Sequence, residues 1–129
     1  MPKATSKATP KTGSQIYQLK ITLKGIRPPV WRRVQVKSTI SLGQLHEIIQ
    51  FAMGWTNSHM HSFDVGGEEY GQPEPSFDFQ VRDEAKAKLN QLVDEKAKFS
   101  YTYDFGDSWD HEILVEKVLP ADPEADYPL

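Results

Sequence analysis

Residues 17–24 read Tyr-Gln-Leu-Lys-Ile-Thr-Leu-Lys, and this stretch sets the pattern of the fold. Apolar and polar side chains alternate along it, which is the two-residue period of a strand with one buried face. Residues 25–29 are rich in glycine and proline, and a second segment rich in valine follows over residues 30–36. Because such a turn lets the chain reverse, the two segments are predicted to pair as a β-hairpin.

A helix is predicted to follow this hairpin. Ser41 and Gln44 have the spacing of a capping box, in which the serine hydroxyl accepts a backbone N–H and the glutamine side chain reaches back. Apolar residues then recur at helical spacing as far as Met53. Gly54 provides the left-handed conformation that commonly ends a helix. We expect the apolar face of this helix to pack on the hairpin.

A third strand is predicted after the helix. Residues 59–65 alternate, which places His59 and His61 on the same face as the apolar side chains that follow them. Gly66-Gly67 is then expected to turn the chain. Residues 71–84 contain glycine and prolines without a clear period, so we interpret them as an irregular excursion.

The last predicted elements are a short helical turn near residues 89–93 and a second hairpin. Residues 99–103 and 109–115 alternate on either side of a turn at residues 104–108. The predicted fold class is therefore α+β, with one mixed β-sheet and one main helix packed on one face. This arrangement is a β-grasp-like two-layer sandwich in a single domain.

Length and composition agree with one domain. The chain has 129 residues, of which 38% are hydrophobic, and its apolar runs are too short to cross a bilayer. No apolar stretch follows the N-terminal lysines, so a signal peptide is not expected and we predict a cytoplasmic protein. The absence of cysteine excludes disulfides and thiolate ligands.

The charge distribution suggests two tails. Residues 1–15 carry three lysines, no acid and almost no apolar residue, so we expect a disordered basic tail. Residues 120–129 carry three acids and no base, and we interpret them as an acidic tail. The domain is predicted over residues 16–119. The net charge of −3 argues against non-specific electrostatic binding of nucleic acid.

Three of the four histidines stand near predicted strand ends, among aspartates and aromatic residues. His59 and His61 at positions i and i+2 point the same way, and with His111 they are candidate metal ligands. Histidines on a half-buried strand more often pack and form hydrogen bonds, and this is the interpretation that we favour. We expect the same of His46 on the helix.

Asp104-Phe105-Gly106 reproduces three letters of the kinase magnesium motif, but the other kinase motifs do not accompany it. We therefore expect Asp104 and Asp107 to accept turn amide hydrogens while Gly106 takes a positive φ.

Arg32 and Arg33 follow Trp31, and such a cluster can stack on bases and bind phosphates. Shielding of the sheet or ion pairing with nearby carboxylates is the favoured interpretation.

Taken together, several segments resemble the plasmid pRiA4b ORF-3-like family, over roughly residues 16–119. The resemblance rests on these segments: Pro28-Pro29-Val30-Trp31-Arg32-Arg33, Leu45-His46, Gly54-Trp55, His59-Met60-His61-Ser62-Phe63, and Tyr101 to His111. It implies a compact sandwich with a mixed sheet and implies no activity, and some relatives are passengers of mobile elements. Longer relatives continue beyond a Tyr-Pro pair into a Cys-containing Pro-Pro-Glu-Asp segment, so a site needing that segment is expected to be incomplete here.

The leading functional hypothesis is a non-enzymatic binding or interaction module with an aromatic and histidine ligand surface. Its candidate residues are Trp55, His59, His61, Tyr101, Tyr103, Asp104, Asp107, Trp109 and His111. The alternative is a metal-dependent hydrolase or nuclease-like enzyme that uses the histidines at 59, 61 and 111 with nearby aspartates. A third hypothesis is nucleic-acid binding through Arg32 and Arg33. We expect a protein or small ligand as partner, no membrane association and no cofactor, with a divalent metal as the alternative.

The charge argument predicts that the protein does not retain nucleic acid. Binding through the basic tail and the two arginines would weaken steeply as salt is added, because each engaged phosphate releases a counterion. We expect no such retention of DNA or RNA at about 0.15 M salt, where surface charges are screened beyond about 8 Å. Tight binding that decays with added salt in a filter-binding titration would contradict this.

Overall fold

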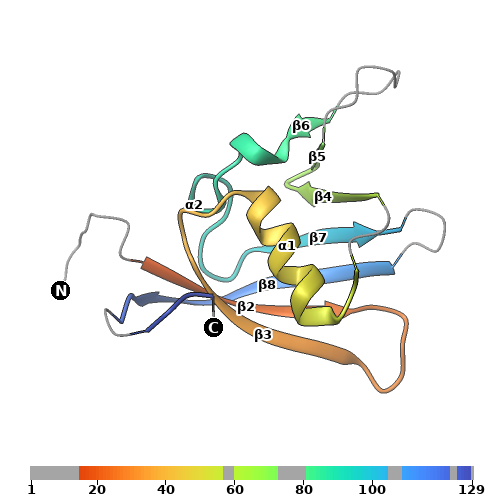
Figure 1. Cartoon of the computed structure of the whole chain (residues 1–129), viewed down its shortest axis with the longest axis horizontal. Helices are drawn as coiled ribbons and strands as arrows, with labels where there is room; N and C mark the ends of the chain where they lie inside the picture. Colours follow the sequence, from red (N-terminus) through yellow and green to blue (C-terminus); the bar gives the residue numbers. More distant parts are fainter. Residues whose placement is uncertain (1–14, 57–59, 73–80, 105–108, 123–124, 129) are drawn as a thin grey trace.

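The computed structural model describes residues 15–56, 60–72, 81–104, 109–122 and 125–128. These residues form one seven-stranded sheet in the order β3-β2-β8-β7-β4-β5-β6, with helix α1 lying across one face (Figure 1). The elements in chain order are β2 (Gln15–Leu23), β3 (Val30–Lys37), α1 (Leu42–Met53), β4 (His61–Val65), β5 (Glu68–Gly71), β6 (Arg82–Asp83), the 3₁₀ turn η2 (Glu84–Lys86), α2 (Leu89–Leu92), β7 (Lys98–Tyr103) and β8 (Trp109–Pro120). No helix in this part of the chain is long and apolar enough to span a bilayer.

The first predicted hairpin is confirmed. β2 and β3 pair antiparallel, with Leu19 opposite Val34. The other edge of β2 pairs antiparallel with β8, with a register shift between Gln18 and Leu19. β2 is thus enclosed on both edges, and Leu19 and Ile21 are completely buried beneath the helix layer.

The predicted helix and both of its ends are confirmed. The Gln44 backbone N–H donates to Ser41 Oγ at 3.1 Å, and the Ser41 N–H donates to Gln44 Oε1 at 2.9 Å, which completes the capping box. Gly54 ends the helix with φ 77°, in the left-handed region. Leu45 and Ile49, one turn apart on α1, are completely buried against the sheet.

Two strands were not predicted. β5 follows the turn at Gly66-Gly67 and pairs with β4, and β6 then pairs in parallel with β5. The interpretation of residues 71–84 as irregular was therefore wrong at both of its ends, while residues 73–80 lie outside the described part. Both strands are too short to show a period, since β5 has four residues and β6 has two. Their pairing depends on partners that are distant in sequence.

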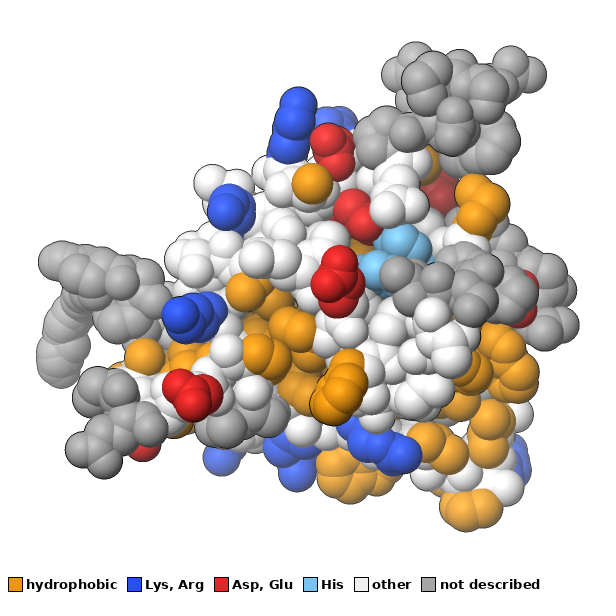
Figure 2. Space-filling view, viewed as in Figure 1, with side chains coloured by type: hydrophobic (Ala, Val, Ile, Leu, Met, Phe, Trp, Pro, Cys, Tyr) orange, Lys and Arg blue, Asp and Glu red, His pale blue; other side chains and the backbone are white. Residues whose placement is uncertain are grey.

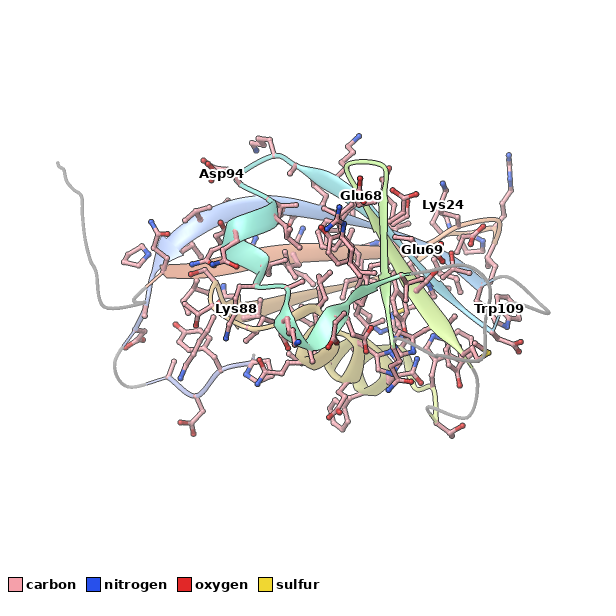
Figure 3. All side chains as sticks on the ribbon, turned by 90° about the horizontal axis from the view of Figure 1, so that it is seen from above. Lys24, Glu68, Glu69, Lys88, Asp94 and Trp109 are labelled. Atoms are coloured by element: carbon pink, nitrogen blue, oxygen red, sulfur yellow. The ribbon has the colours of Figure 1, made fainter. Side chains whose placement is uncertain are left out.

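The predicted fold class is confirmed. The sheet is mixed because β5 and β6 are parallel while its other pairs are antiparallel, and α1 is its main helix. Figure 3 shows α1 on one side of the sheet only. The boundary of the predicted basic tail differs by one residue, because Gln15 already pairs with Pro120 in β2 and β8.

The capping box generates a prediction about stability. Ser41→Ala removes the acceptor for the Gln44 N–H and should lower the free energy of unfolding by about 1 kcal/mol, the usual cost of losing an N-cap. Thr39→Ala is a matched control, because Thr39 is exposed in the preceding turn, and it should change little. Urea denaturation measures both variants, and equal losses would contradict a capping role.

Candidate functional site

Three neighbouring strands bring most of the candidate residues to one face of the sheet. His61 of β4 lies opposite Tyr103 of β7, and Tyr101 of β7 lies opposite His111 of β8. Tyr103 is in turn opposite Trp109. His59 and Asp107 lie outside the described residues. The cross-strand register therefore joins β4 to β7, whose paired residues are about 40 positions apart in the chain, and β7 to β8.

Most residues of the predicted ligand surface are buried in the core. His61, Tyr101, Tyr103 and His111 are all buried, and Tyr101 and His111 have no exposed surface. Trp55 and Trp109, by contrast, are half-buried and pack against the core. The face that carries these residues is the one that α1 covers, so the structure places the polar members of the set beneath the helix.

The Tyr101 hydroxyl is the centre of a buried hydrogen-bond network. It lies 2.7 Å from His46 Nδ1 and accepts a hydrogen bond from Gln50 Nε2 at 2.9 Å. His46 and Gln50 are one turn apart on α1, so they present their polar atoms to the same point of the sheet. Burial raises the pKa of Tyr101, and its phenol stays protonated throughout the physiological range.

A second buried pair adjoins this network. His61 Nε2 lies 2.7 Å from Glu84 Oε1, and both side chains are almost completely enclosed. The His61 ring stacks on the His46 ring with centroids 3.4 Å apart and an interplanar angle of 7°. Asp83 caps η2 by accepting the Ala85 N–H at 2.9 Å, which fixes the turn that carries Glu84.

His46, Gln50 and Glu84 are not among the site residues predicted from the sequence. A signal existed for the first two, because they are polar side chains on the apolar stripe of an amphipathic helix. Glu84 stands in the stretch that was interpreted as irregular, and its sequence neighbourhood carries no comparable signal.

His111 has a different environment from the other histidines. Its Nδ1 donates to the Tyr101 carbonyl oxygen at 3.2 Å, since a carbonyl can only accept. Trp55 Nε1 donates to Nε2 at 3.5 Å, a long contact. Burial lowers the pKa of His111, and the ring is therefore neutral at pH 7.

An aromatic stack closes the end of the sheet beyond His111. The Trp55 ring lies between Tyr103 and Trp109, with centroid separations of 5.4 Å and 5.6 Å. It also meets the His111 ring edge-on at 6.3 Å. Trp55 directly follows the glycine that ends α1, so the helix terminus positions the indole over the strand ends.

The proposed metal ligands do not converge in the described part of the chain. His61 and His111 are on β4 and β8, with β7 between them. Two strand spacings separate their backbones by about 10 Å, and the Tyr101 ring fills the interval. Within residues 15–56, 60–72, 81–104, 109–122 and 125–128, no three His, Asp or Glu side chains are grouped to hold a metal ion.

Asp104 lies at the end of β7 with a positive φ of 62°, which aspartate tolerates better than most residues. Its backbone N–H donates to the Met60 carbonyl oxygen at 2.7 Å and so ties the start of β4 to the end of β7. The predicted acceptance of turn amides concerns residues 105–108, including Gly106, which lie outside the described part.

Arg33 forms a bidentate ion pair with Glu116, with Nε–Oε1 and Nη2–Oε2 distances of 2.7 Å and 3.0 Å. These hydrogen bonds lower the pKa of Glu116 to about 2. The guanidinium also lies over the Trp31 ring, 5.0 Å from its centroid. Arg32 Nη1 donates to the Trp31 carbonyl oxygen at 2.9 Å. Both arginines thus have partners within the protein.

The Tyr101 network predicts that removing the Tyr101 hydroxyl substantially lowers the free energy of unfolding. Tyr101→Phe leaves His46 and Gln50 without this partner and should destabilise the protein by about 1–3 kcal/mol. Tyr17→Phe is the matched control, because the Tyr17 hydroxyl makes one part-buried bond to the Val93 carbonyl oxygen. It should cost less, and equal losses in chemical denaturation would show that the network adds nothing.

The buried His111 predicts a loss of stability in mild acid. Its folded-state pKa lies below the unfolded value of 6.5, so the unfolded chain binds the proton more readily and stability falls as the pH drops below about 6.5. In His111→Gln the melting temperature should fall less between pH 7 and about pH 5 than it does in the unmodified protein. Glu116→Gln should not show this difference, because the pKa of Glu116 is lowered in the folded protein and its contribution to stability is lost only below its ordinary value of 4.5. Identical pH profiles for all three proteins would contradict this assignment.

Comparisons with known proteins identify relatives of the same kind. The chain is 42% identical over 110 residues to the uncharacterized protein y4hQ of Sinorhizobium fredii (strain NBRC 101917 / NGR234), covering 84% of this chain and 57% of that protein. The crystal structure of MM3350, a protein of unknown function from Methanosarcina mazei Go1, superposes with a TM-score of 0.84 at 35% identity, covering 92% of this chain and 68% of that one. The model of the plasmid pRiA4b ORF-3-like protein family matches residues 15–129. With these residues matched, the chain belongs to the plasmid pRiA4b ORF-3-like family.

Proposed function

We propose that this protein is a non-enzymatic binding or interaction module, and that its ligand surface is the aromatic end of the sheet formed by Trp55, Trp109 and Met60. The proposal rests on one observation: the candidate catalytic side chains are buried and form their hydrogen bonds with other groups of the protein. General acid–base catalysis needs a side chain within hydrogen-bond reach of a substrate. His46, His61 and Tyr101 instead face other protein groups beneath α1.

The three residues of the proposed surface each keep apolar area accessible to solvent. Trp55 and Trp109 each keep part of their surface in solvent, and Met60 is 52% exposed. Aromatic residues and methionine are enriched at protein interfaces, where their large apolar area is desolvated on binding. The buried Tyr103 ring packs against the Trp55 indole, with centroids 5.4 Å apart.

A protein or an apolar small ligand suits this surface better than nucleic acid does. Stacking on bases is effective when basic groups lie nearby to bind the phosphates. The arginine beside Trp31 is already paired with Glu116, and the residues that flank the aromatic end include Asp104 and Asp110. Carboxylates beside the surface disfavour a polyanion.

The metal-dependent enzyme remains the alternative, and the buried pair of His61 and Glu84 is the observation in its favour. A hydrogen-bonded His–carboxylate pair is the arrangement that orients a histidine for catalysis or metal binding. In our proposal this pair instead serves to anchor η2 on the sheet.

The ligand surface can be tested with 8-anilinonaphthalene-1-sulfonate, a fluorescent apolar probe. We expect saturable binding to the native protein and a roughly tenfold weaker affinity for Trp109→Ser, as for truncation of a central aromatic anchor. Phe51→Ser is the matched control, since Phe51 is an exposed aromatic residue on α1. If Trp109→Ser still binds the probe and Phe51→Ser does not, the ligand surface is not at the aromatic end.

Zinc titration separates the two functional classes. A ligand that binds only the folded state raises the melting temperature in proportion to its affinity. We expect the melting temperature to be the same with zinc and with a chelator, both in the unmodified protein and in His61→Asn. A zinc-dependent rise that His61→Asn abolishes would favour the enzyme instead.

A further inference from the structure

A separate groove of about 430 Å³ runs between α1 and the end of β3. Its helix wall consists of residues at positions i, i+3, i+4 and i+7, which form one stripe along α1. These are Gln44, Glu47, Ile48 and Phe51. The facing wall includes Val36 and Ile40. Figure 2 shows apolar side chains gathered in the region beside α1.

Phe51 is the most unusual residue of this groove. It is 91% exposed, although the outward stripe of a helix that covers a sheet is ordinarily polar. A single exposed apolar side chain needs no explanation, but this one borders a groove with further apolar residues. Burying it against a partner would remove a large aromatic area from water.

The chain's own Tyr127 and Pro128 already line this groove. The Tyr127 hydroxyl accepts the Asp122 backbone N–H at 3.0 Å, which ties Tyr127 to a residue just after the end of β8. Figure 3 shows this segment on the same side of the sheet as α1. An aromatic–proline pair of the chain itself therefore packs beside the apolar residues of the groove.

The basic residues of β3 and its position at the edge of the sheet indicate that the site continues along this strand. This strand is at one edge of the sheet, and among the described residues it pairs only with β2. It carries no acid and three basic residues, of which Arg33 is already paired with Glu116 on β8 while Arg32 and Lys37 are not ion-paired in the described residues. Residues 121–128 carry three acids and no base. An exposed edge strand beside a groove is the arrangement to which extended peptides add as a further strand.

From these observations we infer that the groove and the β3 edge form a docking site for an extended acidic peptide that carries an aromatic–proline pair. In this inference the segment 125–128, whose Tyr127 and Pro128 line the groove, is a displaceable strap that competes with such a peptide. This site is distinct from the aromatic end of the sheet, so its failure would leave the function proposed above untouched. The competing explanation is that the basic residues only protect the edge from aggregation and that the strap is fixed packing.

The test uses the full chain and a fluorescein-labelled peptide, Ala-Asp-Pro-Glu-Ala-Asp-Tyr-Pro, which copies residues 121–128. The double variant Tyr127→Ser/Pro128→Ser frees the groove without shortening the chain. We expect it to bind the peptide at least about fivefold more tightly than the unmodified protein, because an intramolecular competitor acts at high effective concentration. The affinity should also fall as salt is added.

Two further variants in the same double-variant background locate the binding. Phe51→Ser should weaken peptide binding roughly tenfold, as for loss of an aromatic anchor. It should leave the melting temperature unchanged, because Phe51 is exposed. Met60→Ser, an exposed apolar residue at the other end of the fold, should leave the affinity unchanged. A peptide with Ser-Ser in place of Tyr-Pro should not bind.

Several results would overturn the inference. Equal affinity of the unmodified protein and the double variant would show that the strap does not compete. Binding that ignores Phe51→Ser would place the peptide elsewhere. A dimer in sedimentation that dissociates in the double variant, without a gain in peptide affinity, would make a second copy of the chain the occupant.

Discussion

The Tyr101 hydroxyl is a polar atom placed where no water reaches it, and this placement constrains much of the fold. A buried hydroxyl without partners costs on the order of 1–3 kcal/mol, so α1 must present hydrogen-bonding groups above it. His46 and Gln50 do so from adjacent turns. The capping box at Ser41 fixes where the helix begins, and therefore which residues face the sheet. Apolar packing by Leu45 and Ile49 alone would tolerate small shifts of the helix, whereas two hydrogen bonds to one oxygen do not.

The same network connects elements that belong to different parts of the chain. His61 of β4 stacks on His46 of α1 and bonds to Glu84 of η2. Through these contacts the short turn η2 is held against the helix. Buried polar groups of this kind specify one arrangement when all members are satisfied. The described histidines, His46, His61 and His111, thus have structural roles, and the proposed function assigns recognition to the half-buried indole pair at the end of the sheet.

The architecture leaves two places where a partner could add to it. One is the end of the sheet where Trp55 and Trp109 emerge, and the other is the free edge at β3 beside the groove. Both follow from a single helix covering a wide sheet, since one helix cannot cover every strand end and edge. This chain spans 57% of the length of the Sinorhizobium relative and 68% of the Methanosarcina chain, so those proteins contain further residues beyond the matched region.

The sequence by itself determined the elements that are long enough to display a period. Alternation marked β2, β7 and β8, and the serine–glutamine spacing with Gly54 marked both ends of α1, because these signals lie within a few residues. It also placed His61 and Tyr101 on inward faces, but not their partners. Only the tertiary structure decided that Glu84 meets His61, that β5 and β6 join the sheet, and that Phe51 borders a groove. Each of these depends on a neighbour brought close by the folding of distant segments, and local periodicity records which way a side chain points but not what lies opposite it.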